Sequence, residues 1–577
     1  MSKSKIVIYT VKSESIIWIF EVISSAFWIL KEEKETIDVE IIILEDPSIS
    51  SIKNLLKYFI KLTYININKS LIKSLIKSLI NFFFSKSWKR KIIKFLEEPF
   101  IKNSIYNQID LNQKVFFKHD NINFTIKNSN FINFPYGILI KIKAHIISSF
   151  IFFYYKFLKT PKMFLKLKFN DILIGDIIAS TFLRNNPKNA GSFKLSIPTY
   201  NLLTKVIYCE LKSKYNKSYF LKYSSYLILP EPTYLQILWK RAFIKYGVIP
   251  IETHSYKSKF SLNNDLSLDS PWIASKKEII KISENEKNSI NDFFYTRLNN
   301  PQKIMAYLTE ENSNKNNEKQ IYNLENEIID FKKNKRNESK ELVAVIFLHS
   351  FDDAQYCFGI DDFKDLYEWT IFSIESCLAN NEFDHILIKP HPGLDYNIFP
   401  GDRIAFNKLY KKFNDFEKIN FIKKDSSIVY LSQIANIVGL THHGSIAEEL
   451  IYLNQNAIGY VGGMWSNHYK FLSTWKTKNQ YTDIINGFNK NNFNIPSDSQ
   501  KEHLNNYIIE RKLNPVDLRK YSIRLLLSKK IDAFKHWDFN DYGDAWLRFN
   551  NDTKLICNDN LFKNKILKIL RDQAKII

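Results

Sequence analysis

Cysteine is scarce in this sequence. Its 577 residues contain four: Cys209, Cys357, Cys377 and Cys557. They lie far apart, without the spacing of a disulfide framework or of a zinc site. No Cys, Asp or His lies at a supporting distance from the adjacent pair His442 and His443, so we expect no bound metal and no other cofactor. The cysteines fit a reducing compartment, and we predict a cytoplasmic protein.

Long uncharged apolar runs are also missing. The most apolar later segment, residues 137–158, carries Lys141 and Lys143, which leave too short a core to span a bilayer. At the N-terminus, Lys12 and Glu14 interrupt the apolar run and no small-residue cleavage site follows. We therefore expect no signal peptide and no transmembrane helix.

Negative charge is in deficit. The sequence has 82 Lys and Arg against 60 Asp and Glu, a formal net charge of +22. Such a balance favours anionic partners, which include nucleotides, phospholipid surfaces and nucleic acid. The glycine-rich and sheet-aromatic signatures of nucleic-acid modules are absent, so we expect no nucleic-acid partner.

The length exceeds what one hydrophobic core usually supports, so we expect at least two domains. Apolar runs at residues 5–11 and 39–45 flank a helical pattern near residues 15–31, which predicts a strand, a helix and a strand. A second such series begins with "LVAVIFLHS". The sequence thus predicts an α/β fold in which two Rossmann-like domains face a cleft.

The composition also divides the chain. We assign residues 1–308 to an N-terminal Rossmann-like domain and the Asn-, Lys- and Glu-rich residues 309–340 to a charged linker with one solvated helix. The division continues with a C-terminal Rossmann-like domain, 341–500, and a helical extension, 501–577.

A basic segment interrupts the first domain. In residues 70–98, "SLIKSLIKSLINFFFSKSWKRKIIKFLEE", Leu-Ile pairs recur every four residues with lysines between them. This pattern predicts an amphipathic helix. Its apolar side either packs on the core or lies on an anionic membrane surface, as interfacial helices do.

The stretch "HILIKPHPGLDY" places His391 between Pro390 and Pro392, directly after a short apolar strand. Proline stops the strand, because it lacks the amide donor and has a fixed φ. His391 therefore belongs to a stiff turn at the carboxyl end of a strand, where open α/β sheets bind ligands. The alternative is a histidine that hydrogen-bonds only its own loop.

A second pattern, "VGLTHHGSIAEELIYL", predicts a strand, a polar turn at 441–444 and a helix from Ser445. The first amides of a helix stabilise an anion such as a phosphate. Ser445 and Glu448 have the spacing of a capping box, so we interpret Glu448 as structural. Glu449 is placed to accept ribose hydroxyls, or else is a solvated helix charge. Of His442 and His443, we expect one to face the cleft and the other to face solvent.

A reaction that takes a proton from its substrate at such a site requires a side chain that accepts it. The candidates are Asp352 and Asp353, after the first strand of the second domain, and Asp176 in the first domain. The alternative for the adjacent pair is a helix N-cap with a solvated neighbour. His349 lies at the end of the strand that precedes this pair. The structural interpretation of His349 is that its side chain only fills the end of that strand.

Together, "IKPHPG" and "GSIAEEL" resemble the His-Pro and Ser/Glu motifs of bacterial capsule and lipopolysaccharide glycosyltransferases of the GT-B type, of the Kdo transferase-like or polysialyltransferase-like groups. The resemblance extends to "LHSFDDAQYCFGIDDFKDLYEW" and weakly to "IGDIIASTFLR", where Ser180 stands in place of an expected Asp. The usual Gly-Lys-Pro after the Glu helix is replaced by Asn454, Gln455 and Asn456.

This resemblance implies that the C-terminal domain binds a nucleotide sugar without a metal, while the N-terminal domain takes the acceptor. By motif, His391 contacts donor phosphate, and Ser445 and Glu449 hold phosphate and ribose. Other donor-side candidates are Lys389, Pro392, His443 and Gly444. The implied donor is a CMP-linked 3-deoxy acid such as Kdo or a sialic acid relative, and the implied acceptor is a cell-surface polysaccharide or glycolipid. A peripheral position on the inner face of the cytoplasmic membrane would suit that acceptor.

Three other functions remain open. UDP-sugar 2-epimerases have a motif close to "HGSIAEEL", although this chain has "TVKSES" after its first strand in place of their Gly-Thr-Arg-Pro-Glu stretch. Polyol-phosphate transferases share the His-Pro turn but usually have Asp at the position of Glu449. A non-catalytic protein that binds a membrane surface is consistent with the charge.

Overall fold

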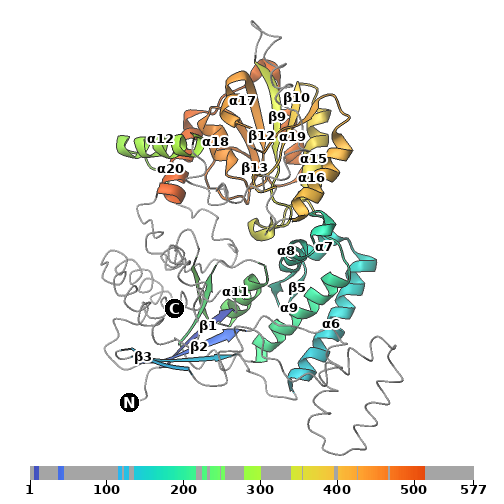
Figure 1. Cartoon of the computed structure of the whole chain (residues 1–577), viewed down its shortest axis with the longest axis vertical. Coiled ribbons are helices and arrows are strands. Elements are labelled where there is room, and N and C mark those ends of the chain that lie inside the picture. Colours follow the sequence, from blue (N-terminus) through green and yellow to red (C-terminus); the bar gives the residue numbers. More distant parts are fainter. Residues whose placement is uncertain are drawn as a thin grey trace, which may run out of the picture.

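Among the residues it describes, the computed structural model contains two six-stranded sheets, one per domain, and a small sheet of β5 (Lys168–Phe169) and β6 (Ile172–Leu173) (Figure 1). It describes residues 5–11, 37–44, 115–119, 122–128, 136–215, 224–230, 234–246, 248–253, 278–299, 340–353, 355–394, 400–424, 426–465 and 468–513. The predicted helix near 15–31, the basic segment 70–98, the linker at 309–339 and the extension beyond 513 lie outside these residues.

The first sheet has the order β3-β4-β2-β1-β7-β8. Five strands are parallel, and β3 pairs antiparallel with β4 at the edge. The chain builds outward from β1 on one side, then crosses to the other, which is the Rossmann pattern. The strands are β1 (Lys5–Val11), β2 (Ile37–Leu44), β3 (Val115–His119), β4 (Ile122–Asn128), β7 (Ser224–Pro230) and β8 (Ile249–Thr253).

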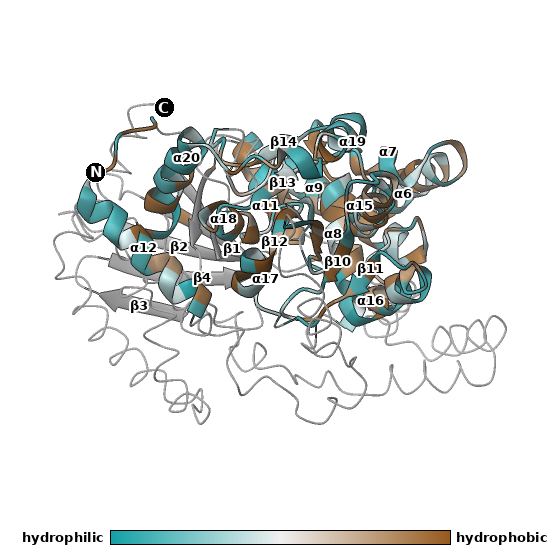
Figure 2. Ribbon diagram, turned by 90° about the horizontal axis from the view of Figure 1, so that it is seen from above, coloured by the Kyte–Doolittle hydropathy of each residue, from teal (hydrophilic) through white to brown (hydrophobic). Residues whose placement is uncertain are grey.

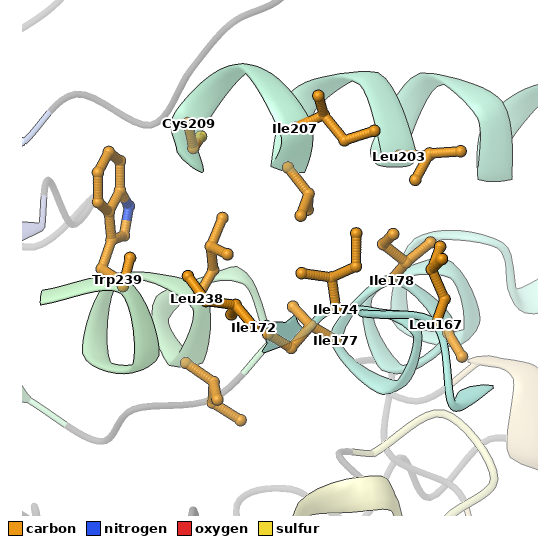
Figure 3. Close-up of a cluster of buried hydrophobic side chains, with 14 of the residues drawn as sticks. Leu167, Ile172, Ile174, Ile177, Ile178, Leu203, Ile207, Cys209, Leu238 and Trp239 are labelled. Atoms are coloured by element: carbon orange, nitrogen blue, oxygen red, sulfur yellow. The ribbon is translucent and has the colours of Figure 1, made fainter. Parts of the chain in front are cut away.

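Helices of the first domain share an apolar core. Leu203 and Ile207 of α9 face Ile177 and Ile178 of α8, and Leu238 of α11 lies beside them (Figure 3). The elements are α6 (Tyr136–Leu158), α7 (Pro161–Leu165), β5 (Lys168–Phe169), β6 (Ile172–Leu173), α8 (Gly175–Asn185), η1 (Pro187–Asn189), α9 (Ile197–Tyr215) and α11 (Leu235–Lys245).

The second sheet has the order β11-β10-β9-β12-β13-β14, and all of its strands are parallel. Counted from β9, this is the 3-2-1-4-5-6 order of the Rossmann fold. Its central strand β9 is buried at six successive residues, as expected of a strand covered on both faces. The strands are β9 (Glu341–Phe347), β10 (His385–Lys389), β11 (Ile419–Phe421), β12 (Ala435–Leu440), β13 (Asn456–Tyr460) and β14 (Ser473–Trp475).

One helix from before the linker also belongs to this domain. Ile290 and Phe294 of α12 (Glu284–Asn299) share a core with Leu504 and Tyr507 of α20. The sequence-based division put residues 278–299 in the first domain, so the structure differs here, because the apolar face of α12 packs on α18 and α20. The other elements are η5 (Gln355–Phe358), α15 (Leu366–Ala379), α16 (Pro400–Phe413), α17 (Ile428–Ile434), α18 (Ile446–Tyr452), α19 (Lys478–Asn486), η6 (Lys490–Asn492), α20 (Asp498–Ile508) and η7 (Ile509–Leu513).

The connection from β9 to α15 joins the two domains. Its residues Tyr356, Cys357 and Phe358 are buried in the core of the first domain. Nearby, the Phe193 amide donates to Asp365 Oδ2 at 3.0 Å. The carboxyl end of β9 therefore meets the first domain.

The expected α/β fold with two Rossmann-like domains is confirmed by these strand orders. Hydrophobic and hydrophilic residues alternate around most helices that cover the sheets (Figure 2). Within the described part of the chain, no helix is both long and apolar enough to cross a bilayer. The cysteines described, Cys209, Cys357 and Cys377, are buried free thiols.

Candidate functional site

The sequence motifs meet where the order of the second sheet reverses. β9 and β12 are neighbours, but the strands that follow each in the chain lie on opposite sides. At such a point the connections diverge from the carboxyl ends of the strands, and the space between them is where Rossmann-like domains bind nucleotides. His349 follows β9, and His442 and His443 follow β12. His391, after β10, belongs to the same edge.

The ring of His391 is fixed by its own loop. The amide of Gly393 donates to His391 Nδ1 at 3.0 Å, so the neutral ring carries its proton on Nε2. The pKa of His391 is lowered to about 4, mainly because the ring is buried; the Asp353 charge opposes this effect and the Lys389 charge adds to it. The alternative prediction, that His391 hydrogen-bonds its own loop, is therefore confirmed. This bond uses Nδ1, so Nε2–H is the hydrogen-bond donor of the neutral ring.

Histidines after β9 and β12 form a hydrogen-bonded chain. His442 Nε2 contacts Asp361 Oδ2, and His442 Nδ1 lies 2.9 Å from His443 Nδ1. If Nε2–H donates to the carboxylate, Nδ1 of His442 accepts the Nδ1 proton of neutral His443. The lone pair of His443 is then on Nε2, which makes it a hydrogen-bond acceptor or a base.

The expectation that one histidine of this pair faces solvent is not met, because His442 is buried and His443 is only partly exposed. The ring of His443 stacks on Phe358, with centroids 4.1 Å apart, and lies 4.2 Å from the ring of His349. Burial, followed by the His349 and His442 charges, holds the pKa of His443 well below its usual value.

His349 does more than fill the end of a strand. Its Nε2 lies 3.0 Å from Thr441 Oγ1 and accepts from the amide of His442 at 3.0 Å. These bonds hold the turn after β12 against the end of β9. Gly444 belongs to this turn: its amide donates to Thr441 Oγ1 at 3.1 Å, and a Cβ at Gly444 would lie 3.1 Å from His349 Cε1.

Ser445 and Glu449 are both bound by Arg297 of α12. Arg297 Nη2 donates to Ser445 Oγ at 2.6 Å, and Nε donates to Glu449 Oε1 at 2.7 Å. Burial raises the pKa of Glu449, although the Arg297 charge opposes this effect. The solvated alternative for Glu449 is therefore wrong. The Ser445 hydroxyl accepts from Arg297 and can still donate its own proton to a ligand.

The capping box predicted for Ser445 and Glu448 is not formed. Ser445 makes no side-chain cap hydrogen bond, and α18 is only seven residues long. Glu448 is instead fully buried and accepts from the Tyr507 hydroxyl at 3.1 Å, with Arg297 Nη1 at 3.6 Å. Glu448 is therefore structural, as expected, but its partners belong to α20 and α12 and not to the start of its own helix. So short a helix gives little support to an anion site at its N-terminus, because the peptide dipoles sum over few residues.

Asp352 is buried and caps a helix. Its Oδ2 accepts from the amide of Gly401, in the first turn of α16, at 2.7 Å. Asp402 makes the reciprocal bond, with Oδ1 accepting from the Phe351 amide at 2.7 Å. Burial raises the pKa of Asp352 to about 6 and that of Asp402 to about 7, and each carboxylate faces the other's loop.

Asp353, the neighbour of Asp352, is exposed. Its Oδ1 accepts from the Tyr234 hydroxyl of the first domain at 2.6 Å. Of our alternative for this pair, only the solvated neighbour is found: Asp353 is exposed, but Asp352 binds the start of α16 from 49 residues away and is not the N-cap of a helix that follows it in the chain. Asp353 nevertheless lies where the two domains meet, on the His391 side of the site.

Asp176 lies at the start of α8 and forms a buried ion pair. Arg241 Nη1 and Nη2 donate to its two oxygens at 2.9 and 2.7 Å. Ser180, on the same helix, is also buried. The preceding Gly175 packs against backbone, since a Cβ there would lie 2.7 Å from the Leu165 carbonyl oxygen. The weak first-domain motif thus has a structural explanation, and Asp176 is a poor candidate for a base.

Lys389 turns toward the next loop. Its Nζ donates to the carbonyl oxygen of Lys424 and lies 3.5 Å from that of Lys423. Its charge still acts on His391 and on Glu449. In the described residues, no group of three or more His, Cys, Asp or Glu side chains is arranged to hold a metal ion.

Three site residues were missed by sequence reasoning. Asp361 stands in the quoted "FGIDDFKDLYEW" stretch, so its acidic pair was a usable signal. Asp402 follows a Pro-Gly pair at a helix start, which is a weaker signal. Arg297 had none, because its role depends on where α12 packs.

No family model matches this chain, and no curated protein matches it either. Solved structures that resemble it include α,α-trehalose 6-phosphate synthase from Burkholderia multivorans, at 7% identity over 92% of this chain and 100% of that one, with a TM-score of 0.28.

Two further solved structures have similar values. A glycosyltransferase from Rickettsia africae ESF-5 has 11% identity over 93% of this chain and 98% of that one, with a TM-score of 0.25. UDP-GlcNAc 2-epimerase from Methanocaldococcus jannaschii has 11% identity over 87% and 98%, with a TM-score of 0.23. Likeness at these scores carries no argument about chemistry, so the function is inferred from the site itself.

Proposed function

We propose that this protein is a GT-B type glycosyltransferase that binds a nucleotide sugar at the reversal point of the second sheet. One observation carries the proposal. Histidines from the ends of β9, β10 and β12 gather at the edge where Rossmann-like domains bind nucleotides. Their order along the chain matches the motifs of the resemblance.

Each of three residues has its own role in binding the donor. His391 donates Nε2–H to a donor phosphate oxygen, and Ser445 donates its hydroxyl proton to the same group. Glu449, positioned by Arg297, accepts a ribose hydroxyl. Preorganised donors of this kind stabilise the charge that develops on a leaving nucleotide phosphate.

Asp353 is our choice for the proton acceptor. Asp176 is paired with Arg241, and Asp352 caps α16, so both carboxylates are engaged in the fold. Asp353 is exposed and contacts the first domain through Tyr234. An acceptor hydroxyl held by the first domain would reach it first.

For the donor we propose a CMP-linked 3-deoxy acid, and for the acceptor a cell-surface polysaccharide or glycolipid at the inner face of the cytoplasmic membrane. The resemblance supports both. The chemistry is compatible, because such a donor carries a phosphate and a carboxylate, and the chain carries a net charge of +22.

A nucleotide-sugar screen tests this proposal. Hydrolysis or transfer should be fastest with CMP-linked sugars, and CMP should raise the melting temperature more than CDP or UDP. A ligand at one hundred times its Kd adds about 2.7 kcal/mol of stability. A clear preference for UDP with CMP inert would contradict the cytidine assignment. Formation of a 2-epimer without transfer would favour the epimerase, and inactivity with every nucleotide sugar would contradict the enzyme.

Two substitutions test the site. His391→Ala and Glu449→Gln should each lower turnover by about a hundredfold, which corresponds to roughly 3 kcal/mol for a lost charge-stabilising contact. Gln is chosen for Glu449 because its carbonyl oxygen can still accept from Arg297. His385→Ala is the control, since His385 begins the same strand at its far end. Full activity of His391→Ala, with an unchanged circular dichroism spectrum, would remove His391 from the site.

A further inference from the structure

An apolar stripe runs along the outside of α6. Eight large apolar side chains on this helix are exposed, and six of them, exposed by fractions from 46% at Ile142 to 76% at Phe150, form the stripe. The six are Leu139, Ile142, Ile146, Phe150, Phe153 and Phe157. Their spacing of three or four residues places them on one face, over roughly 27 Å at 1.5 Å per residue.

The opposite face of α6 already packs on the protein. Ile140, Ala144, Ser148 and Phe152 are buried. Phe152 meets Tyr200 of α9 with ring centroids 5.6 Å apart. In Figure 1, α6 lies at the outer side of the first domain with α9 inside it. The helix is thus apolar on both faces, which is not typical of a surface helix facing water.

Positive charge borders the stripe, and α6 contains no Asp or Glu. Lys141 and Lys143 lie near its start, and Lys156 near its end, with Lys159 directly beyond. Lys156 Nζ lies 5.6 Å from the ring centroid of Phe152 and 5.8 Å from that of Phe157. Aliphatic lysine stems beside aromatic rings, with the ammonium at the edge, are typical of helices at a membrane surface.

We propose that the α6 stripe docks on an anionic lipid bilayer and inserts its Phe and Ile side chains between the headgroups. The helix lies flat, because its other face stays packed on α9. A second copy of the chain is a poorer occupant. Two such helices, parallel or antiparallel, would bring lysines near lysines without any acidic residue on α6 to pair with them. Anionic headgroups supply the missing charge.

Vesicle co-sedimentation of the full chain tests the proposal without reference to enzyme activity. The probe is phosphatidylcholine vesicles with and without 30% phosphatidylglycerol. The stripe variant is Phe150→Ser, Phe153→Ser, Phe157→Ser. The control variant changes three exposed apolar residues of the second domain: Tyr295→Ser, Phe416→Ser and Ile495→Ser.

Wild type and control should bind the anionic vesicles with affinities within about twofold. The stripe variant should bind at least tenfold more weakly, and 0.5 M NaCl should weaken wild-type binding, because salt screens the lysines. Equal binding by the stripe variant would overturn the proposal, even if residues 70–98 attach the chain to lipid. A wild-type dimer by light scattering that the stripe variant abolishes, without vesicle binding, would assign the stripe to a second copy. If wild type does not bind vesicles and only the stripe variant has a lower melting temperature, the stripe would be assigned to a contact with another segment of the same chain.

Discussion

Arg297 connects two predicted donor residues to a helix that sequence reasoning placed in the other domain. It is 5% exposed and approaches Glu448 and Glu449, which are buried or nearly so. Removing one partner of such a group leaves charge uncompensated in a poorly polarisable interior. We expect Arg297→Ala to lower the free energy of unfolding by about 3–5 kcal/mol, measured by urea denaturation.

Lys287 on the same helix supplies the control. It forms an exposed pair with Glu284 at 3.0 Å, and exposed pairs are worth about 0–1 kcal/mol. Lys287→Ala should therefore leave the urea midpoint nearly unchanged. A loss for Arg297→Ala no larger than that of Lys287→Ala would show that the buried pairs do not support α12.

Asp402 predicts a pH dependence of stability. Its folded-state pKa is raised to about 7, and that of Asp352 to about 6, from an ordinary value of 3.8. The folded state then binds more protons than the unfolded state between about pH 4 and pH 7, so stability falls as pH rises through that window. One pKa unit corresponds to about 1.4 kcal/mol, which makes the loss on the order of a few kcal/mol.

Asp402→Asn should flatten this dependence. The amide keeps an oxygen to accept from the Phe351 amide but has no proton to lose. Urea denaturation at pH 5, 6, 7 and 8 measures the slope. Asp415→Asn, at an exposed position soon after α16, should leave the slope as in wild type. A slope unchanged by Asp402→Asn would mean that other groups dominate this window.

At the scale of elements, Gly175 lets α8 begin against the backbone of α7. A Cβ at Gly175 would lie 2.7 Å from Leu165 O and closer still to Phe164 O. Because backbone cannot rotate away as a side chain can, Gly175→Ala should cost about 1–3 kcal/mol of stability, measured as a lower melting temperature.

Gly487, which follows α19, is the matched control. A Cβ there would meet Ile484 O at 3.4 Å and Asp483 O at 3.5 Å, which are ordinary contacts, and its φ is −72°. Gly487→Ala should be neutral or slightly stabilising, since Ala restricts the unfolded chain. If both substitutions have the same effect, the close approach at Gly175 is not what limits that position.

At the scale of the whole molecule, the domains share part of a core. Tyr356 and Phe358 lie in the chain of the second domain but are buried in the first. Gly191 of the first domain likewise lies against Phe351 of the second, and Lys162 pairs with Asp362 at 3.1 Å. Unfolding one domain therefore exposes apolar surface of the other, which couples the two transitions.

We expect the two domains to unfold together. Hydrogen exchange with increasing urea should give one opening free energy for peptides from α9 and from β9. Phe358→Ala should weaken the coupling and separate the two values, because it removes an aromatic ring from the shared core. Separate transitions in the wild-type chain would contradict the coupling.

The sequence by itself determined the features that depend on neighbouring residues. Apolar runs between polar segments predicted strands that the structure places at residues 5–11, 341–347, 385–389 and 435–440. Proline on both sides of His391 fixed the turn, and the polar run 441–444 marked the end of its strand. These features follow from local backbone chemistry, so the α/β class and the edge that carries the motifs were accessible without coordinates.

Only the tertiary structure decided how the site residues are used. Ser445 and Glu448 have the spacing of a capping box, but neither side chain bonds the other's backbone. Arg297 of α12 donates a hydrogen bond to the Ser445 hydroxyl. Tyr507 of α20 donates one to Glu448. Asp361 reaches His442 from 81 residues away. Such partners are brought together by the packing of apolar helix faces, and the free energy of that packing is spread over many residues. No short sequence pattern therefore predicts which charged side chains become neighbours in the folded chain.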